Sequence, residues 1–291
     1  MNDTMPPLDM PIGACDCHNH VVGPQDKYPM DPARVYTGDV APVAALLAER
    51  KKLGISRNIL IQASFYGTDN RCMLDGLAEL GETARGIAVV SPDISNEDLR
   101  ALDARGVRGV RVNLETGGTR DPKVAATALS ALGERLAPLD WHIQLYAMLS
   151  VITQIADQIA RLPVPVVIDH FGRAVAAKGV AQPGFSTLLD LVRARKIYVK
   201  LSGSRHISKL PDESDVAPLA RALIEAGRDR LVWGSDWPHT SRRPDGSRTE
   251  IAPYAKVDDA AQLRNLRSWC QDASVWKAIL VDTPAKLYRF S

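Results

Sequence analysis

Residues 230–238, RLVWGSDWP, form the last of eight short runs in this chain that read as β-strands. The run opens with apolar and aromatic residues and ends in Gly-Ser-Asp, which is typical of a strand that leads into a turn. Seven runs of similar character precede it, at residues 15–22, 57–64, 86–92, 106–113, 141–148, 164–171 and 197–203. The run at 230–238 therefore raises the number of predicted strands to eight.

Helical patterns lie between these runs. Residues 40–54 end in Lys-Lys-Leu-Gly, and a glycine in this place is a common helix stop. Residues 95–106 open with a Ser or Asn cap followed by acidic residues and close on a glycine, and residues 212–230 repeat this pattern. Eight strands that alternate with helices predict a parallel sheet of the α/β class, closed into a single-domain (β/α)₈ TIM barrel.

Length and composition agree with this architecture. The chain has 291 residues, which suits one barrel of roughly 250 residues, so we expect one domain over 1–291 with residues 1–13 as an N-terminal extension. Apolar residues make up 45% of the chain and charged residues 24%, as in soluble globular proteins. The net charge is 36 − 34 = +2, which predicts neither a nucleic-acid partner nor a membrane surface.

Location and redox environment are also constrained by the sequence. No apolar run approaches the length of about 18 residues that a membrane span requires. The first residues lack the basic and apolar regions of a secretory signal, so we expect a cytoplasmic protein. Its four cysteines are too few for a disulfide scaffold at this length.

Four residues stand where a barrel places its chemistry, at the carboxyl ends of the strands. His18 and His20 follow each other at a spacing of two in the first run, so their side chains point to the same side. His170 ends the sixth run and Asp236 ends the eighth. We therefore expect these four side chains to converge. The His-x-His pair is open to three interpretations: metal ligands, hydrogen-bond donors to a substrate, or residues of a solvated edge.

Each of these residues also has a structural interpretation. A lone histidine such as His170 more often packs against its neighbours than binds a ligand, and Asp236 could cap the turn before Pro238. His142 stands at the start of its run, so we expect it to be structural. Joint placement favours function, because the histidines and the aspartate all occur at the same end of their strands.

The motifs at these positions resemble those of the amidohydrolase superfamily, and in particular its lactonase branch. They are CHNH (17–20), YTGDVAP (36–42), YGTDN (66–70), GVRGVRVN (106–113), IDHFGR (168–173) and GSDWPH (234–239). The resemblance covers nearly the whole chain and implies a TIM-barrel hydrolase of aromatic or sugar-acid catabolism. The branch includes lactonases for pyrone, muconolactone and sugar-acid substrates and also a lactone isomerase, so the motifs indicate the branch better than the substrate.

The metal content of the site can be argued from the fifth run, 141–148. A hydrolytic zinc needs three or four ligands around an open position. The histidine of this run lies at its start, while Gln144 and Tyr146 stand at its end. This pattern resembles the metal-free members of the branch, so no cofactor is expected. The alternative is one zinc ion held by His18, His20 and Asp236.

The resemblance also implies a mechanism for lactone hydrolysis. His18, His20 and His170 polarise the lactone carbonyl through their N–H groups, which stabilise the oxyanion that forms when water adds. Asp236 acts as the general base for that water and then returns the proton to the leaving oxygen.

Substrate recognition is likewise implied by the resemblance. Arg111 and Arg205 would hold an anionic group of the lactone, with Arg205 the clearer candidate because Arg111 could pair with Glu115. The polar contacts would come from Tyr36, Ser64 and Tyr146. The stretch 114–120 lacks a second basic cluster, so a lactone with one carboxylate, a sulfonated lactone or a sugar-acid lactone remains open.

The expected function is a hydrolase whose partner is a small anionic lactone. The sequence also allows other functions. The same barrel could house a zinc-dependent hydrolase or decarboxylase, or a lactone isomerase. A binding protein without catalysis is a further alternative, which the complete set of three histidines and one aspartate disfavours. The oligomeric state is not predicted.

Overall fold

The computed structural model describes residues 8–290, and within them eight parallel strands form one sheet. The strands, in spatial order, are β1 (Cys15–Asn19), β3 (Arg57–Ile61), β4 (Ala84–Ala88), β5 (Val107–Asn113), β6 (His142–Tyr146), β7 (Val166–Ile168), β8 (Ile197–Ser202) and β9 (Leu231–Gly234). Each of the eight predicted runs overlaps one of these strands, and seven contain theirs whole; β4 begins at Ala84, before its predicted run. Most strands end earlier than predicted, because the last residues of the runs turn into the loops at the mouth of the barrel.

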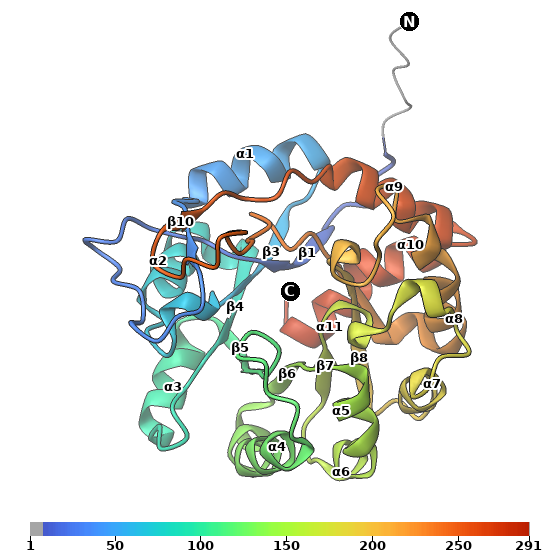
Figure 1. Ribbon diagram of the computed structural model, residues 1–291, viewed down its shortest axis with the longest axis horizontal. Helices are drawn as coiled ribbons and strands as arrows, with labels where there is room; N and C mark the ends of the chain where they lie inside the picture. The colour runs from blue at the N-terminus through green and yellow to red at the C-terminus, as the bar shows by residue number, and fades with distance from the viewer. Residues whose placement is uncertain (1–7, 291) are drawn as a thin grey trace, which may run out of the picture.

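The first and last strands close the sheet into a barrel. Asn19 forms a parallel bridge with Trp237. The Asp236 N–H donates to His18 O at 2.8 Å, and the His20 N–H donates to Trp237 O at 2.9 Å. These bonds confirm the predicted single-domain (β/α)₈ barrel, whose strands are ringed by helices (Figure 1).

The helices surround the barrel in the described part of the chain. They are α1 (Val43–Leu53), α2 (Arg71–Leu80), α3 (Asn96–Ala104), α4 (Pro122–Leu136), α5 (Leu149–Gln154), α6 (Ala156–Arg161), α7 (Phe185–Arg193), α8 (Ala217–Gly227), α9 (Asp259–Trp269), α10 (Ala273–Lys277) and α11 (Thr283–Tyr288). Gly54 ends α1 with a left-handed φ of 71°, and Ser95 caps α3 by accepting the Asp98 N–H. Both ends are as predicted.

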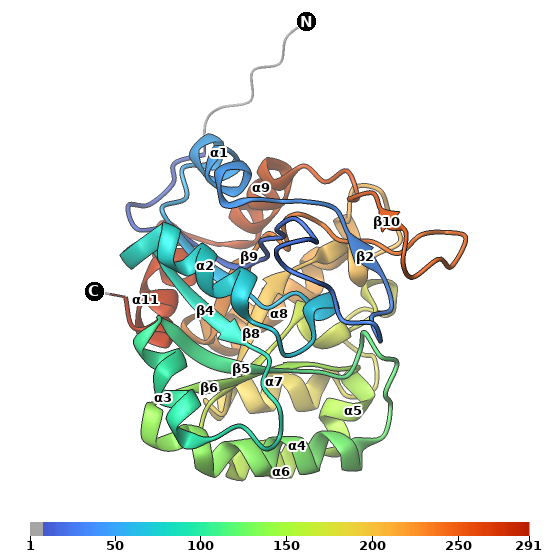
Figure 2. The same cartoon turned by 90° about the vertical axis from the view of Figure 1, so that its left-hand side faces the viewer.

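The two ends of the barrel differ in character. At the end where the strands begin, α11 covers the opening, and Tyr288 packs inside it against apolar barrel residues. His142 lies here, buried, with its ring 5.3 Å from that of Tyr288, as expected of a structural residue. Figure 2 shows α11 and the C-terminus at one end of the barrel and two short strands at the other.

Those two strands, β2 (Thr37–Gly38) and β10 (Ile251–Ala252), pair in parallel and were not predicted. β10 lies within the segment 238–256, which the sequence indicates only as a polar loop. Thr37 Oγ1 donates to Arg248 O at 2.8 Å, and the Tyr254 hydroxyl donates to Asp39 O. The loop after β9 is therefore anchored to the loop after β1 at the mouth.

Part of the predicted N-terminal extension, residues 1–7, lies outside the described residues. Of the remainder, Asp9 O accepts a hydrogen bond from the Trp276 indole N–H at 3.0 Å. Among residues 8–290, no helix combines the length and apolar character that crossing a bilayer requires.

Candidate active site

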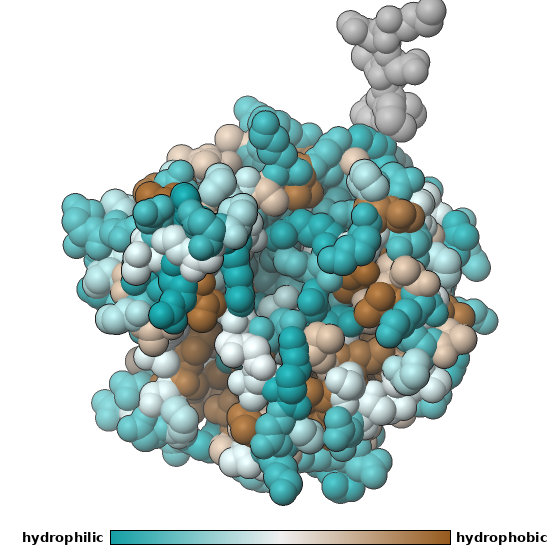
Figure 3. All heavy atoms as spheres, viewed as in Figure 1, coloured by the Kyte–Doolittle hydropathy of each residue, from teal (hydrophilic) through white to brown (hydrophobic). Residues whose placement is uncertain are grey.

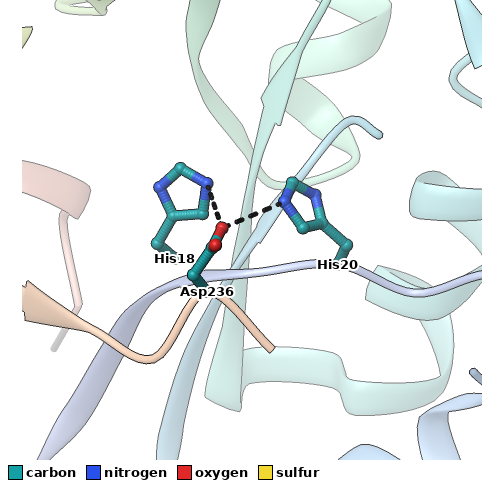
Figure 4. Close-up of side chains that lie close together, drawn as sticks. All are labelled: His18, His20 and Asp236. Atoms are coloured by element: carbon teal, nitrogen blue, oxygen red, sulfur yellow. Dashed lines mark ion pairs between the residues drawn. The ribbon is translucent and has the colours of Figure 1, made fainter. Parts of the chain in front are cut away.

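The four residues predicted to converge do so around one oxygen atom. His18 and His20, from the end of β1, point towards Asp236, which follows β9 (Figure 4). Asp236 Oδ1 lies 3.6 Å from His18 Nε2, 3.9 Å from His20 Nε2 and 4.0 Å from His170 Nε2. All four side chains are buried. Three imidazole nitrogens thus face one carboxylate oxygen at the base of the mouth.

The backbone is unusual at two of these positions. His170 has φ = 49° and Asp236 has φ = 66°, a left-handed region that costs a residue other than glycine about 1–3 kcal/mol. Such strain persists where the surroundings hold a side chain in place, which is common at functional sites. Glycine is required beside two of the rings: a Cβ on Gly203 would lie 2.7 Å from His170 Nδ1, and one on Gly234 would lie 2.5 Å from His18 Cβ.

The second oxygen of Asp236 is held by two residues that follow β8. Oδ2 accepts hydrogen bonds from Arg205 Nη2 and from His206 Nε2, each at 2.9 Å. Burial alone would raise the pKa of Asp236, but its contacts with His20, His206 and His170 outweigh burial and hold the pKa well below its usual range. Asp236 is therefore a carboxylate at neutral pH. His206 is absent from the predicted site, although it stands next to Arg205 in the sequence.

A buried polar network lies behind His18. Lys200, in β8, is fully buried, and its Nζ lies 2.9 Å from Cys17 O, 2.7 Å from Gln144 Oε1 and 3.3 Å from His18 Nδ1. Asp169 Oδ1 lies 3.6 Å from the same Nζ. Sequence reasoning missed Lys200 and Asp169 as site residues. The sequence feature that could have revealed them is a charged residue inside an apolar run. Charges are rarely buried without partners, so such a residue indicates a buried polar network.

Charge within the site follows from this packing. Burial, with a smaller contribution from Lys200, lowers the pKa of His18 to about 3, and burial also holds the pKa of His170 well below its usual range. Burial likewise lowers the pKa of Lys200. For Asp169, burial would raise the pKa, but Lys200, His18 and Arg111 outweigh it and hold it well below its usual range. His18 and His170 are therefore neutral at pH 7, and Asp169 is charged.

The hydrogen-bond partners of the histidines constrain their tautomers. His20 Nδ1 lies 2.8 Å from Ile61 O, and a carbonyl can only accept, so Nδ1 of His20 carries a proton. In the neutral form of the His20 ring the lone pair therefore lies on Nε2, and only a doubly protonated ring can donate from Nε2 to Asp236. His170 Nδ1 lies 2.9 Å from Ser202 Oγ, which can donate or accept. Thus Ser202 is compatible with a proton on His170 Nε2.

A cavity of about 600 Å³ opens above these groups, within the range of about 300–1,000 Å³ that is usual for ligand sites. In the space-filling view a hollow surrounded by hydrophilic residues lies near the middle of this face (Figure 3). The cavity is lined by eight of the nine predicted residues, His20, Tyr36, Ser64, Arg111, Tyr146, His170, Arg205 and Asp236. His18 lies beneath them, fully buried. The structure thus brings all nine together, and their individual roles remain predictions.

The two predicted anion-binding arginines have different surroundings. Arg205 is tied to Asp236 and to Thr240 O, at 3.2 Å. Arg111 lies over the Tyr146 ring, 5.4 Å from its centroid, and reaches Asp169 Oδ2 only at 3.4 Å. The pairing with Glu115 that the sequence left open for Arg111 is not formed.

Glu115 instead pairs with Arg120 and Arg173. These two arginines approach Glu115 from the chain after β5 and the chain after β7, respectively, and satisfy its carboxylate. Arg111 thus has fewer close partners than Arg205, and which of the two holds a substrate anion stays a prediction.

The alternative zinc site was tested against these contacts. Ligand atoms of His18, His20 and Asp236 lie within 4.8 Å of one another, so a group that could hold a metal exists. His20 fits, because metal-bound histidines usually donate their other N–H to a carbonyl or carboxylate. His18 Nδ1 lies between two groups, the Asp169 carboxylate at 3.4 Å, which would suit a metal ligand, and the Lys200 ammonium at 3.3 Å, which would not. Gln144 of β6 is also engaged, since it bonds Lys200 and Asp169. The Lys200 ammonium beside His18 and the engaged Gln144 side chain are the features that argue against a zinc ion at this group.

Comparison with known proteins places the chain in a family. The family model described as amidohydrolase matches residues 15–290, so the chain belongs to the amidohydrolase family of enzymes. It is 34% identical to a 4-sulfomuconolactone hydrolase from Hydrogenophaga intermedia, with 96% of this chain and 89% of the relative covered. A 2-pyrone-4,6-dicarboxylate hydrolase from Comamonas testosteroni is also 34% identical, over 99% of this chain and 93% of the relative.

A solved structure supports the same assignment. It is the crystal structure of a probable 2-pyrone-4,6-dicarboxylic acid hydrolase from Acinetobacter baumannii with citric acid bound. The two folds agree with a TM-score of 0.81 at 26% identity, and the match covers 96% of this chain and 100% of the other.

Proposed function

We propose that this protein is a lactonase that opens the ring of a small anionic lactone by addition of water. The observation that carries the proposal is the Asp236 carboxylate oxygen faced by three imidazole nitrogens at 3.6–4.0 Å in a buried, strained site. The two relatives that are 34% identical, which are named as lactone hydrolases, support it.

In the proposed mechanism the neutral His18 and His170 rings donate N–H groups to the lactone carbonyl oxygen. When water adds to the carbonyl carbon, these donors stabilise the oxyanion, each by about 3–4 kcal/mol in a buried site. The lone pair of His20 orients the water, and Asp236 Oδ1 takes its proton. The proton then passes to the ring oxygen as the C–O bond breaks. This mechanism retains all four predicted catalytic residues but changes the role of His20, because Ile61 O accepts the Nδ1 proton and the neutral form of the ring then has its lone pair on Nε2.

For the substrate we propose a lactone with at least one carboxylate or sulfonate, held by Arg111 and the hydroxyl groups of Tyr36, Ser64 and Tyr146. Tyr36 OH and Ser64 Oγ are 2.9 Å apart in the cavity wall and can bind one ligand oxygen together. We propose that the reaction needs no metal cofactor, since the Lys200 ammonium beside His18 Nδ1 opposes a metal on that ring.

The test is Asp236→Asn, assayed on a panel of pyrone-dicarboxylate, sulfomuconolactone and sugar-acid lactones with a pH indicator. Loss of the general base should lower kcat by about 10²–10⁴-fold with the fold retained. Asp245→Asn is the control, because Asp245 is exposed, pairs with Arg243 and lies outside the cavity. Near-normal turnover of Asp236→Asn would make this residue a turn cap and contradict the mechanism.

The same assay separates the alternative functions. The wild-type enzyme, dialysed against a chelator and checked by elemental analysis, should keep its rate, and the product should carry the mass of one added water. Loss of activity that zinc restores would instead indicate a metal-dependent hydrolase. A product of unchanged mass would indicate a lactone isomerase, and release of CO₂ a decarboxylase.

A further inference from the structure

We infer that Lys200 is a positioning residue that holds His18 in the tautomer with its proton on Nε2, so that the His-x-His pair faces the site as one donor and one acceptor. The inference deepens the proposed function and rests on it for its catalytic meaning. The observation behind it is the set of contacts around the fully buried Lys200 side chain.

Two of the three protons of the Lys200 ammonium have certain acceptors. Cys17 O, at 2.9 Å, is a carbonyl and can only accept. Gln144 presents its Oε1 at 2.7 Å, because its Nε2 is occupied in donating to Asp169 Oδ2 at 3.0 Å. The third proton can reach His18 Nδ1, at 3.3 Å, or Asp169 Oδ1, at 3.6 Å, and His18 Nδ1 is the nearer of the two.

The charge of Lys200 is supported by its surroundings. The Asp169 carboxylate lies 3.6 Å from Nζ and is itself fully buried, so the pair compensates two charges that would each be costly alone. An ammonium has no lone pair and cannot accept a proton from an imidazole. A proton on His18 Nδ1 would therefore face a proton of Lys200, which disfavours that tautomer.

The rival partner for a proton on His18 Nδ1 is Asp169 Oδ1, 3.4 Å away. This oxygen has no partner with hydrogen-bond geometry among residues 8–290, and the same holds for His18 Nε2. A fully buried Nε2–H without a partner, aimed at the mouth and 3.6 Å from Asp236 Oδ1, is a donor available to a substrate oxygen. Lys200 thus supplies a reason for the donor role of His18.

His20 has the opposite arrangement. Its Nδ1–H donates to Ile61 O, so in the neutral form of the ring the lone pair lies on Nε2. His18 lies in β1 and His20 directly follows it. The partners of their Nδ1 atoms thereby give the two rings different roles at Nε2. A zinc ion would need lone pairs on both Nε2 atoms, and Lys200 opposes this on His18 only.

The direct test is ¹⁵N NMR of protein labelled at histidine, with signals assigned from His18→Gln and His20→Gln. In the wild-type protein His18 should show the Nε2–H tautomer and His20 the Nδ1–H tautomer. An Nδ1–H tautomer of His18 in the wild-type protein would overturn the inference, and this measurement requires no variant of Lys200 to fold.

The second test is Lys200→Met, which retains a long apolar side chain and removes the donor. His18 should then move its proton to Nδ1, towards Asp169, and kcat should fall by about 10²–10³-fold with little change in KM, as for loss of one oxyanion donor. Zinc affinity, measured by calorimetry with zinc alone, should rise by about 10–100-fold, the scale of effects of groups behind a metal ligand. Lys196→Met, at an exposed position just before β8, is the control and should change neither quantity.

These outcomes separate the two proposals. An Nε2–H tautomer of His18 in a protein that hydrolyses no lactone would sink the proposed function and leave the role of Lys200 supported. Normal lactone turnover with unchanged His18 tautomer and unchanged zinc affinity in Lys200→Met would sink the role of Lys200 and leave the lactonase supported.

Discussion

Arg111 and Arg205 show how the surroundings of single residues decide what each can bind. Arg205 donates to the same Asp236 oxygen as His206, so its charge supports the proposed general base. Arg111 is held by a cation–π contact with Tyr146 and a long contact with Asp169, and it lines the cavity. We therefore expect Arg111 to read the charge of the substrate and Arg205 to serve the reaction centre.

This difference predicts that the Arg111 variant discriminates between charged and neutral substrates, whereas the Arg205 variant loses activity on both. Arg111→Met should weaken kcat/KM for an anionic lactone about 10–150-fold more than for its neutral ester, since a charge-assisted contact contributes about 1.5–3 kcal/mol. Arg205→Met should lower kcat for both substrates by a similar factor. Arg193→Met is the control, because Arg193 is exposed, pairs with Asp190 and lies outside the cavity. A loss in Arg111→Met that is equal on the two substrates would refute the anion-binding role.

At the scale of elements, a buried ion-pair network centred on Arg50 connects α1, β1, α9 and the end of β9. Arg50 of α1 is fully buried and pairs with Asp16 of β1 and with Asp259 of α9, at 3.1 Å for the latter. Asp16 Oδ1 in turn accepts the backbone N–H groups of His18 and Ser235, each at 3.0 Å. The network therefore holds the ends of β1 and β9, which carry three of the proposed catalytic residues.

Removing the centre of this network should be costly. Arg50→Met leaves two buried carboxylates without their partner, and we expect the free energy of unfolding to fall by about 3–5 kcal/mol. Lys52→Met on the same helix removes an exposed pair with Glu49 and should cost about 0–1 kcal/mol. Urea unfolding of the three proteins measures both values. Equal stability of the two variants would show that the buried network contributes little.

For the whole molecule, buried histidines link stability to pH. Burial, with a smaller contribution from Lys200, lowers the pKa of both His18 and His142 to about 3, and burial shifts His170 and His206 in the same direction. Between pH 6.5 and 3 the unfolded chain therefore binds protons that the folded chain does not. Because acid then favours the unfolded state, stability is lost as the pH falls through this window.

Each strongly shifted histidine should lower the free energy of unfolding by about 2 kcal/mol between pH 7 and pH 5. We expect His142→Gln to show a drop smaller by about that amount, because His142 lies away from the site and its share of the proton linkage is removed. Urea unfolding of the wild-type and variant proteins at both pH values measures the difference. The same drop in both proteins would mean that His142 is accessible to protons in the fold. Below about pH 4, protonation of Asp169 and Asp236 should add to the loss, since their folded pKa values are depressed.

Strand identity and the end of each strand that carries chemistry could be predicted from the sequence. Both are local properties: a strand buried on two faces is an apolar run, and His18, His20, His170 and Asp236 occur where such runs stop. The resemblance of the motifs added the family. The pairing of β2 with β10 could not be predicted, because two-residue strands more than two hundred positions apart have no recognisable pattern.

The sequence by itself therefore determined the barrel, its mouth and the residues that meet there. Only the tertiary structure decided what each of those residues can do, because hydrogen-bond partners come from strands distant in sequence. Lys200 reaches His18 across 182 positions, and Ile61 reaches His20 across 41. The proton of each ring is placed by such a neighbour, and no pattern within a single strand records which neighbour the closed barrel will bring.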